Sequence, residues 1–443
     1  ATGYWHSPMG APDYSQEDVV EAAAGLHARN LSTSLFVIDY FNWAHTGDYT
    51  FNPEKWPDPK NMSDYLSSLG TRLMVSAWPF VNREGSRASA AAVEHGYVVR
   101  DDAGEPVLWP DAVCDRLCHL YDPTNPAARR FLFDQLETGY LRYGVRSFWF
   151  DASEPENVAN FTTSGHAFQN PLGQPQGSRY HLGTNQQVGM MFPWFHAKMA
   201  FDGLMSRFPN EAPVTLSRSG WAGTQRFGAA HWNGDLEATW TNLKKTVITG
   251  QNAQLSGFAW WTHDIGAING CNISDAGYQE LLVRWFQLGV VTPIFRNHGS
   301  RPVEPWKLQG FGSSGEEAYR AIVRMMHLRE DMRPYVKELM SEAAASGTPA
   351  NRPLSWDFPA DPEAWFVTGQ LMFGPRFMFA PVTDPGVREL SVYFPHGGAC
   401  IVWRHYLRPS ETYDAGSHAK VRVPLDEPAI FECVSDQNAV IAV

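Results

Sequence analysis

The chain has 443 residues, of which 44% are hydrophobic and 19% are charged, and its formal net charge is −12. This hydrophobic content is enough for a large core and argues against a disordered protein. The acidic balance and the lack of a Lys/Arg run argue against a nucleic-acid-binding protein, and no stretch of about 18 apolar residues predicts a membrane span.

Short hydrophobic runs alternate with amphipathic helical stretches over the first three quarters of the chain. A first strand is expected near Tyr4, and further strands at residues 35–39, 72–78, 147–151, 214–217, 255–261 and 290–294. Helices are expected at residues 17–29, 62–69, 127–143, 188–207 and 316–345. Repeated strand–helix units of this kind predict an α/β protein, and the length suits a (β/α)8 TIM barrel followed by a smaller module.

Polar and aromatic residues stand at the ends of several predicted strands: Asp39, Trp78, Asp151, Arg218, Asp264 and Arg296. In a (β/α)8 barrel the C-terminal strand ends converge on the active site, so these positions predict one shared pocket. Any single Asp among them is equally well explained as a helix N-cap in the following loop.

The pattern changes after about residue 354. Strand-like runs at residues 371–381, 389–394, 401–403, 419–423 and 429–432 are separated by Gly, Pro and Asp. They predict a small antiparallel β module. We therefore expect a catalytic (β/α)8 barrel at residues 1–350 and a β-sandwich-like module at residues 351–443.

Five cysteines are present: Cys114, Cys118, Cys271, Cys400 and Cys433. Their odd number and wide spacing favour isolated thiols, with one disulfide left open. Cys114 and Cys118 have no matching second pair, so no metal site is expected. The chain also lacks a phosphate-binding glycine loop, and no cofactor is predicted. Four Asn-x-Ser/Thr sequons permit a secreted origin, but the chain shows no signal-peptide pattern, so secreted and cytoplasmic locations both remain open.

Two short segments, residues 148–154 and 231–235, each place a carboxylate just after a predicted strand. Their carboxylates, Asp151 and Asp235, form a candidate catalytic pair, because two carboxylates that face one sugar can break a glycosidic bond. Glu154 is a rival for the first position, and Glu156 is interpreted as a loop or support residue. Seventeen Trp residues suit a carbohydrate site, although a large core explains them at least as well.

The ordered motifs resemble glycoside hydrolase family 31, within its bacterial-type α-xylosidase-like branch. The resemblance runs almost from end to end and includes residues 37–41, 74–79, 121–126, 148–154, 218–226, 231–235, 260–266 and 296–299. Members of that family usually carry a β-sandwich before the barrel, whereas this chain opens at the barrel. The resemblance thus leaves open a fragment of a larger protein or a reduced form, and it leaves the rim of the pocket undetermined.

The resemblance implies that Asp151 is the nucleophile and Asp235 the general acid/base of a retaining, exo-acting α-glycosidase. It also implies the substrate-binding residues: Asp39, Phe41, Trp78, Trp149, Arg218, Trp232, Trp261, Asp264 and His298. A nucleophile must stay ionised, which requires positive charge or hydrogen-bond donors nearby. A general acid must keep its proton near neutral pH, which requires partial burial or a negative neighbour.

The sugar is indicated by Phe41, two residues after Asp39. A bulky aromatic residue here resembles the side chain that fills the hydroxymethyl position in α-xylosidases of the family. Trp149 occupies a position where several α-xylosidases have Lys and α-glucosidases have Trp. An α-xylosidase is therefore predicted, with α-glucosidase, α-galactosidase and transglucosylase activities as alternatives and a non-catalytic carbohydrate-binding relative as a further one. The expected partner is an oligosaccharide or glycoside; a homo-oligomer is left open.

Overall fold

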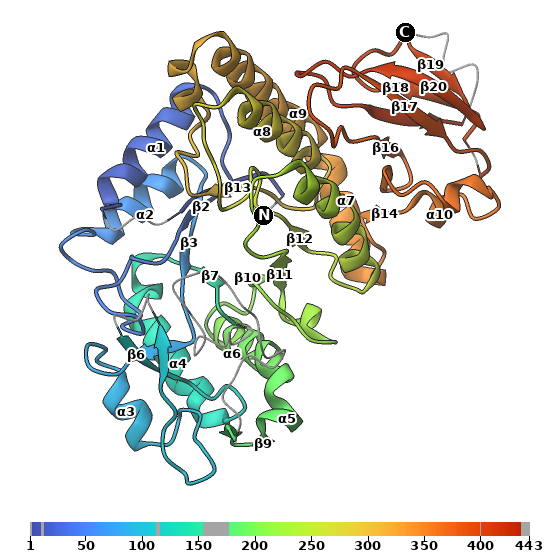
Figure 1. The fold of residues 1–443 in the computed structure, drawn as a ribbon. Coiled ribbons are helices and arrows are strands. Elements are labelled where there is room, and N and C mark those ends of the chain that lie inside the picture. The colour runs from blue at the N-terminus through green and yellow to red at the C-terminus, as the bar shows by residue number, and fades with distance from the viewer. Residues whose placement is uncertain (1, 10–12, 112–115, 154–176, 399, 436–443) are drawn as a thin grey trace. The chain divides into compact units, whose positions relative to one another are not determined.

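The computed structural model describes residues 2–9, 13–111, 116–153, 177–398 and 400–435 (Figure 1). The chain divides into two compact units. The N-terminal unit contains Met9–His27 and Leu35–Trp232, and the C-terminal unit contains Ala1–Pro8, Ala28–Ser34 and Asn233–Val443. The expected domain boundary at residue 350 stays a prediction.

Five parallel strands form the centre of the N-terminal unit. Their order across the sheet is β2 (Leu35–Ile38), β3 (Arg72–Ser76), β7 (Ser147–Phe150), β10 (Val214–Ser217) and β11 (Ala229–Trp232). The helices between and before them are α1 (Gln16–Ala28), α2 (Pro59–Ser68), α4 (Pro126–Gly139) and α6 (Phe192–Arg207). Parallel neighbours need such crossover connections, so the predicted strand–helix alternation is confirmed here.

Helix starts in this unit follow from capping residues. Asp58 accepts a hydrogen bond from the Asn61 amide at 3.0 Å at the start of α2, and Asn125 accepts one from the Ala127 amide at 2.9 Å at the start of α4. Each cap is followed by a proline, whose fixed φ suits the first helical turn.

Shorter elements complete the N-terminal unit. An antiparallel sheet is made of β4 (Phe80–Asn82), β6 (Arg116–Leu120) and β5 (Trp109–Asp111), and β8 (Arg179–Tyr180) pairs with β9 (Gly183–Thr184). The short helices are α3 (Ser89–Glu94) and α5 (Asn185–Val188). The helix expected from residue 188 is divided, because a 3-10 turn at Gly189–Met191 separates α5 from α6.

The C-terminal unit begins with a second set of strands and helices. Strand β1 (Tyr4–Pro8) runs parallel to β13 (Phe295–Gly299), and β12 (Trp261–Thr262) follows α7 (Trp240–Leu255). Helices α8 (Ala276–Val290) and α9 (Gly312–Ser346) pack against each other (Figure 1). The long helix expected at residues 316–345 is thereby confirmed.

Arg329 of α9 joins these elements through backbone contacts. Its side chain is fully buried and donates hydrogen bonds to the carbonyl groups of Thr2, Val290, Thr292 and Pro293, at 2.6–3.1 Å. A buried guanidinium needs such acceptors on its donors, so one side chain satisfies the end of α8 and the start of the chain together.

Two predicted strands are wrong in position. Residues 255–261 contain the end of α7 and a loop, and only Trp261 of that run enters β12. Of residues 290–294, Val290 ends α8 and the other four lie between α8 and the start of β13. The C-terminal part of α8, from Leu281 to Val290, is buried on all sides, so hydrophobicity alone could not distinguish this helix from a strand.

The antiparallel β module is confirmed at the end of the C-terminal unit. One sheet has the order β14 (Asn351–Arg352), β15 (Leu371–Phe373), β16 (Phe377–Phe379), β21 (Ile430–Val434), β18 (Val402–His405) and β19 (Thr412–Asp414). Strands β17 (Glu389–Phe394) and β20 (Ser417–Arg422) form a separate pair, and α10 (Leu354–Asp357) precedes β15. The run at residues 371–381 is a hairpin of two strands, because Gly374 turns the chain at φ 59°.

The expectation of isolated thiols is wrong for this module. Cys400 and Cys433 form a disulfide, with their Cα atoms 5.3 Å apart. The pair becomes adjacent because β18 and β21 are neighbours, with Trp403 opposite Cys433 in the register. Cys118 is also disulfide-bonded, and Cys271 is a free thiol.

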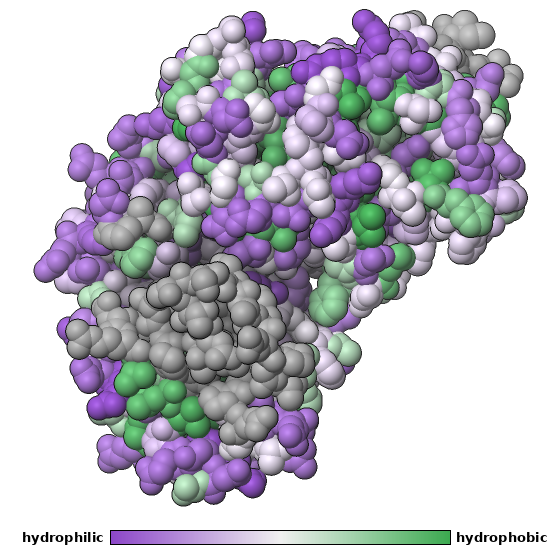
Figure 2. Space-filling view, viewed as in Figure 1, coloured by the Kyte–Doolittle hydropathy of each residue, from purple (hydrophilic) through white to green (hydrophobic). Residues whose placement is uncertain are grey.

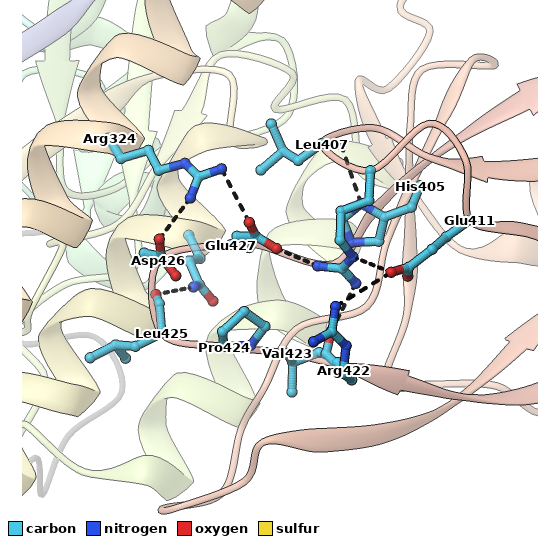
Figure 3. A network of polar contacts seen from close by, with 12 residues as sticks. Arg324, His405, Leu407, Glu411, Arg422, Val423, Pro424, Leu425, Asp426 and Glu427 are labelled. Carbon is cyan, nitrogen blue, oxygen red and sulfur yellow. Dashed lines mark hydrogen bonds and ion pairs between the residues drawn. The ribbon is translucent and has the colours of Figure 1, made fainter. Parts of the chain in front are cut away.

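Polar contacts join the module to α8 and α9, and Figure 3 shows those of Arg324 from α9. Arg284 of α8 donates to the carbonyl groups of Val423 and Pro424 at 2.8 and 3.1 Å. Arg324 of α9 donates to Asp426 at 2.7 Å and to Glu427 at 3.3 Å. The loop before β21 is thus bound to both helices by backbone and side-chain acceptors.

The described surface is largely hydrophilic in the view of Figure 2, where hydrophobic residues are mostly separated by polar ones. Within the described ranges, no helix combines the length and apolar character needed to cross a membrane.

We expect stability to fall in mild acid because of His196. The side chain of this α6 residue is buried, its Nδ1 lies 2.6 Å from the Tyr121 hydroxyl, and burial lowers its pKa to about 3. An unfolded His has a pKa of about 6.5, so the unfolded state binds more protons and stability is lost as the pH falls below that value. Between pH 7 and 5 the His196→Phe variant should lose about 2 kcal/mol less than the wild type, measured by urea unfolding at both pH values.

The matched control is His27→Phe, which changes an exposed residue near the end of α1. Its pH dependence should follow the wild type. An identical pH slope for His196→Phe and the wild type would contradict the assignment of this acid sensitivity to His196.

Candidate active site

Five of the predicted site residues stand at the carboxyl ends of the five neighbouring strands of the N-terminal unit. Asp39 comes directly after β2, Trp78 two residues after β3, Asp151 directly after β7 and Arg218 directly after β10, and Trp232 is the last residue of β11. Because the strands are parallel, their carboxyl ends lie at one edge of the sheet. The structure therefore brings these residues to a common edge of this unit.

Asp151 and Arg218 form an ion pair at this edge. Arg218 Nη1 lies 3.2 Å from Asp151 Oδ1, and the two side chains are only 12% and 13% exposed. The Ala152 amide also donates to Asp151 Oδ1 at 2.8 Å, with Ala152 in the left-handed region at φ 51°. A guanidinium and an amide donor both stabilise the ionised carboxylate, which is the state that a nucleophile requires.

The loop after β2 presents Asp39 and Phe41. Asp39 is buried, and its Oδ1 accepts a hydrogen bond from the Tyr40 amide at 2.7 Å. Phe41 is half-buried with φ 69°, a conformation that bulky residues rarely adopt, and its ring lies 4.1 Å from that of Tyr40. The unusual backbone of Phe41 indicates that its surroundings fix the position of its ring.

Asn42 supports this loop and was not identified from the sequence. Its side-chain amide donates to the Asp39 carbonyl at 2.9 Å and to the Ser76 carbonyl at 3.2 Å, and its oxygen accepts from the Tyr140 hydroxyl at 2.6 Å. Asn42 is fully buried, so it ties the ends of β2 and β3 together. Its only sequence signal is its place just after a predicted strand.

Aromatic rings make a second feature of the N-terminal unit. Trp149 of β7 meets Trp232 of β11 edge to face, with centroids 5.7 Å apart and planes at 76°. Trp78 lies 5.6 Å from Tyr40. Trp149 and Trp232 are buried and Trp78 is half-buried, so the first two also serve the core and Trp78 offers more of its face to a ligand.

Asp264 and His298 belong to a buried polar network in the C-terminal unit. Asp264 follows β12 and pairs with Arg296 of β13, and both side chains are almost fully buried. Arg296 Nε donates to Ser7 Oγ at 3.3 Å, and His298 Nδ1 donates to the Ser7 carbonyl at 2.8 Å. Ser7 was not identified from the sequence; it enters the network because β1 lies in register beside β13.

His298 is held in one neutral form. Burial and the nearby Arg296 charge keep its pKa well below the usual range. A carbonyl oxygen can only accept, so Nδ1 carries the hydrogen and Nε2 has acceptor character. The ring is therefore suited to accept a hydrogen bond from a hydroxyl group.

Trp261 and Asp235 are the other predicted residues of the C-terminal unit. Trp261 is buried against Gly250 of α7, where a Cβ atom would lie only 2.7 Å from the indole ring. Asp235 is exposed and follows Gly234, at φ 75°, in the loop after β11. The partial burial expected around a general acid is thus not observed at Asp235. Glu154 and Glu156 lie outside the described residues.

Within the described ranges, no group of three or more His, Cys, Asp or Glu side chains is arranged to hold a metal ion. The chemistry that these residues can perform is that of carboxylates beside a cation, with aromatic faces and neutral hydrogen-bonding groups around them.

Comparison with known proteins identifies the family. The model of the glycosyl hydrolases family 31 TIM-barrel domain matches residues 1–339, and that of the family 31 C-terminal domain matches residues 347–432. The chain belongs to glycoside hydrolase family 31. The predicted fold class, a (β/α)8 barrel followed by a small antiparallel β module, is confirmed.

Relatives within family 31 include enzymes of different specificity. The chain is 33% identical to alpha-xylosidase A of Aspergillus niger over 96% of its own length and 61% of that protein. It is 27% identical to human neutral alpha-glucosidase C, covering 94% of the chain and 44% of that protein. A family 31 alpha-xylosidase from a soil metagenome, solved with xylose, has 32% identity and a TM-score of 0.87, covering all of this chain and 64% of the other. The chain thus spans roughly two fifths to two thirds of these relatives' lengths.

We expect Asp264→Asn to destabilise the protein strongly. The substitution leaves the buried Arg296 charge without its carboxylate, at a cost of about 3–5 kcal/mol. The measurement is the free energy of unfolding in urea at neutral pH.

Asp426→Asn is the control, because Asp426 pairs with Arg324 but its side chain is 49% exposed. It should cost less than about 1 kcal/mol. Similar small losses in both variants would show that the Asp264–Arg296 pair contributes little.

Proposed function

We propose that this protein is a retaining, exo-acting α-glycoside hydrolase that prefers α-xylosides. The observation that carries the proposal is the ion pair of Asp151 and Arg218 at the end of two neighbouring strands, in a chain that belongs to family 31. The similarity to alpha-xylosidase A of Aspergillus niger supports the choice of sugar.

Asp151 and Asp235 have complementary roles in the proposed reaction. Asp151 attacks the anomeric carbon while Asp235 protonates the leaving oxygen, so the glycosidic bond breaks and a covalent glycosyl-enzyme forms. Asp235 then removes a proton from water, which attacks the anomeric carbon and releases Asp151. Two inversions give net retention and require the carboxyl groups about 5–5.5 Å apart. Arg218 stabilises Asp151 when it leaves as a carboxylate.

The other predicted residues bind the sugar. Asp39 accepts hydrogen bonds from hydroxyls far from the anomeric carbon, whereas Arg218 and His298 bind hydroxyls near it. Neutral His298 suits this role, because Nε2 can accept from a hydroxyl while Nδ1 is occupied by Ser7. Trp78, Trp149 and Trp261 supply the apolar wall, with Trp232 beside the acid/base. Asp264 acts indirectly, by holding Arg296 next to Ser7.

Phe41 is the proposed specificity residue. Its ring, fixed by the left-handed backbone and the contact with Tyr40, would fill the space that a hexose needs for its hydroxymethyl group. Xylose lacks that group. An α-glucosidase is the second candidate, favoured by Trp149 and by the similarity to neutral alpha-glucosidase C. One hydroxymethyl group changes the discrimination by a few kcal/mol, which a few side chains can supply.

We expect the 443-residue protein to hydrolyse p-nitrophenyl α-xyloside faster than the α-glucoside and α-galactoside, with the α-anomer as first product. Asp151→Ala should lower kcat at least about a thousandfold, as removal of a covalent nucleophile does. The assay measures p-nitrophenol release, and proton NMR identifies the anomer that forms first.

Azide distinguishes the two carboxylates. Azide should restore activity to Asp235→Ala and give a glycosyl azide of retained configuration. If azide restores activity to Asp151→Ala, the glycosyl azide should have inverted configuration. A β-anomer as first product would contradict the retaining mechanism. Hydrolysis of none of the three glycosides would overturn the enzymatic proposal, and preference for the glucoside would select the second candidate.

Phe41→Ala should shift the preference towards the glucoside. Removal of the ring opens space for the hydroxymethyl group, so the ratio of kcat/KM for glucoside to xyloside should rise about tenfold or more. Phe366→Ala, which removes a ring that is 83% exposed in the C-terminal unit, should leave the ratio unchanged. An unchanged ratio in Phe41→Ala would remove Phe41 as the specificity residue.

A further inference from the structure

Two buried serine hydroxyls connect the strand ends that carry Asp151 and Arg218. Ser153 Oγ lies 2.9 Å from Ser217 Oγ, and Ser217 Oγ donates to the Ser219 carbonyl at 2.9 Å. The exposed fractions of Ser153 and Ser217 are 0% and 2%. Ser217 has one hydroxyl hydrogen, which it gives to the carbonyl, so Ser153 is the donor in the Ser153–Ser217 bond. The hydroxyls therefore form a directed chain.

The residues of this hydroxyl chain are close neighbours of Asp151 and Arg218 in the sequence. Ser217 directly precedes Arg218, and Ser153 comes two residues after Asp151. The hydroxyl contact thus joins the loop after β7 to the end of β10 at the place where Asp151 and Arg218 meet. Left-handed Ala152 turns the backbone between Asp151 and Ser153. The Ser153–Ser217 contact therefore ties this turn to the last residue of β10.

A third strand contributes to the same point. His231, on β11, lies opposite Ser217 in the register of β10 and β11, and its side chain is buried. Ser217 at the end of β10 thus has β7 on one side and β11 on the other, so the ends of three neighbouring strands meet at its hydroxyl chain. A buried chain of hydroxyl groups holds a single arrangement when its donors and acceptors are paired, as those of Ser153 and Ser217 are.

We propose that the hydroxyl chain from Ser153 through Ser217 to the Ser219 carbonyl is a positioning device that holds Asp151 and Arg218 in their catalytic arrangement. The inference rests on the proposed function, in which Asp151 is the nucleophile. Ser153 and Ser217 touch neither sugar nor reacting atoms in this scheme; they act through the Asp151–Arg218 pair.

The pH dependence of kcat/KM reports on Asp151 only if the other titratable groups near the Asp151–Arg218 pair do not change charge in the same pH range. Outside the pair itself, Asp39 follows β2, and the serine variants do not alter it. His231 on β11 and His196 on α6 pack against the same strands, and burial lowers their pKa values to about 4 and about 3. Both rings are therefore neutral above pH 5, where the acidic limb of activity is to be measured.

The decisive variant is Ser217→Ala in the full chain. Loss of both its hydrogen bonds should let Arg218 move from Asp151, and a displacement of about 1 Å is enough to lower kcat about 10- to 100-fold. Because the ionised nucleophile loses its cation, the acidic limb of the kcat/KM profile should move to higher pH by about half a unit or more. KM should change less than kcat. Ser153→Ala should act in the same direction but more weakly, since Ser217 keeps its bond to Ser219.

The matched control is Ser76→Ala. Ser76 is also buried and also the last residue of its strand, β3, but its hydroxyl makes no hydrogen bond to any described residue. It should show the wild-type pH profile and kcat. Ser217→Thr, which restores a hydroxyl, should recover part of the lost kcat and return the acidic limb towards wild type.

The possible results distinguish a failure of the positioning role from a failure of the proposed hydrolase function. The positioning role alone would be overturned if the wild type is active and Asp151→Ala is inactive, but Ser217→Ala keeps the wild-type kcat and the wild-type acidic limb. Equal effects in Ser217→Ala and Ser76→Ala would also overturn it, because they would reflect the general loss of a buried hydroxyl. A wild type without activity on any glycoside would overturn the proposed function and the positioning role with it.

Discussion

The register of β7 against β10 determines where the charges of the N-terminal unit meet. Phe150 lies opposite Ser217 in the parallel ladder, so the next residues, Asp151 and Arg218, leave the sheet side by side. A slip of one residue would turn every following side chain to the opposite face. The carboxylate, its cation and the neighbouring serine contact all follow from this single alignment of two short strands, which are buried except for half-buried Val214.

The buried arginines of the C-terminal unit have two kinds of hydrogen-bond acceptor. Arg329 and Arg284 donate to backbone carbonyls, whereas Arg296 has a carboxylate partner in Asp264. Carbonyl acceptors suit arginines that join elements of the scaffold, because they add no second charge to the interior. A carboxylate partner, by contrast, leaves a fixed dipole next to Ser7 and His298, where the proposed substrate hydroxyls require one defined hydrogen-bond pattern.

The sequence could predict the repeated strand–helix units and the polar residues at the ends of their strands. The alternation of strands and helices, and the polar residues after β2, β7 and β10, follow from hydrophobic patterning and are seen in the structure. It could not place β12 and β13, because the apolar residues of the two wrongly placed runs belong mostly to helix ends and loops, which hydrophobicity alone does not distinguish from strands. It could not pair Cys400 with Cys433 either, since their contact depends on β18 lying next to β21. Asn42, Ser7 and Ser217 act through side-chain and backbone hydrogen bonds to residues distant in sequence or in a neighbouring loop, which leave no periodic signal.

The disulfide gives the C-terminal module a stability that depends on its chemical environment. Cys400 and Cys433 are 33 residues apart, and closing a loop of that size stabilises a fold by roughly 3–4 kcal/mol in the chain-entropy model. Recombinant production in a reducing cell interior would yield the module without this cross-link, and export to an oxidising compartment would yield it complete. Preparations of one and the same polypeptide would then differ in shelf life and in resistance to proteases, for reasons that lie in the expression host.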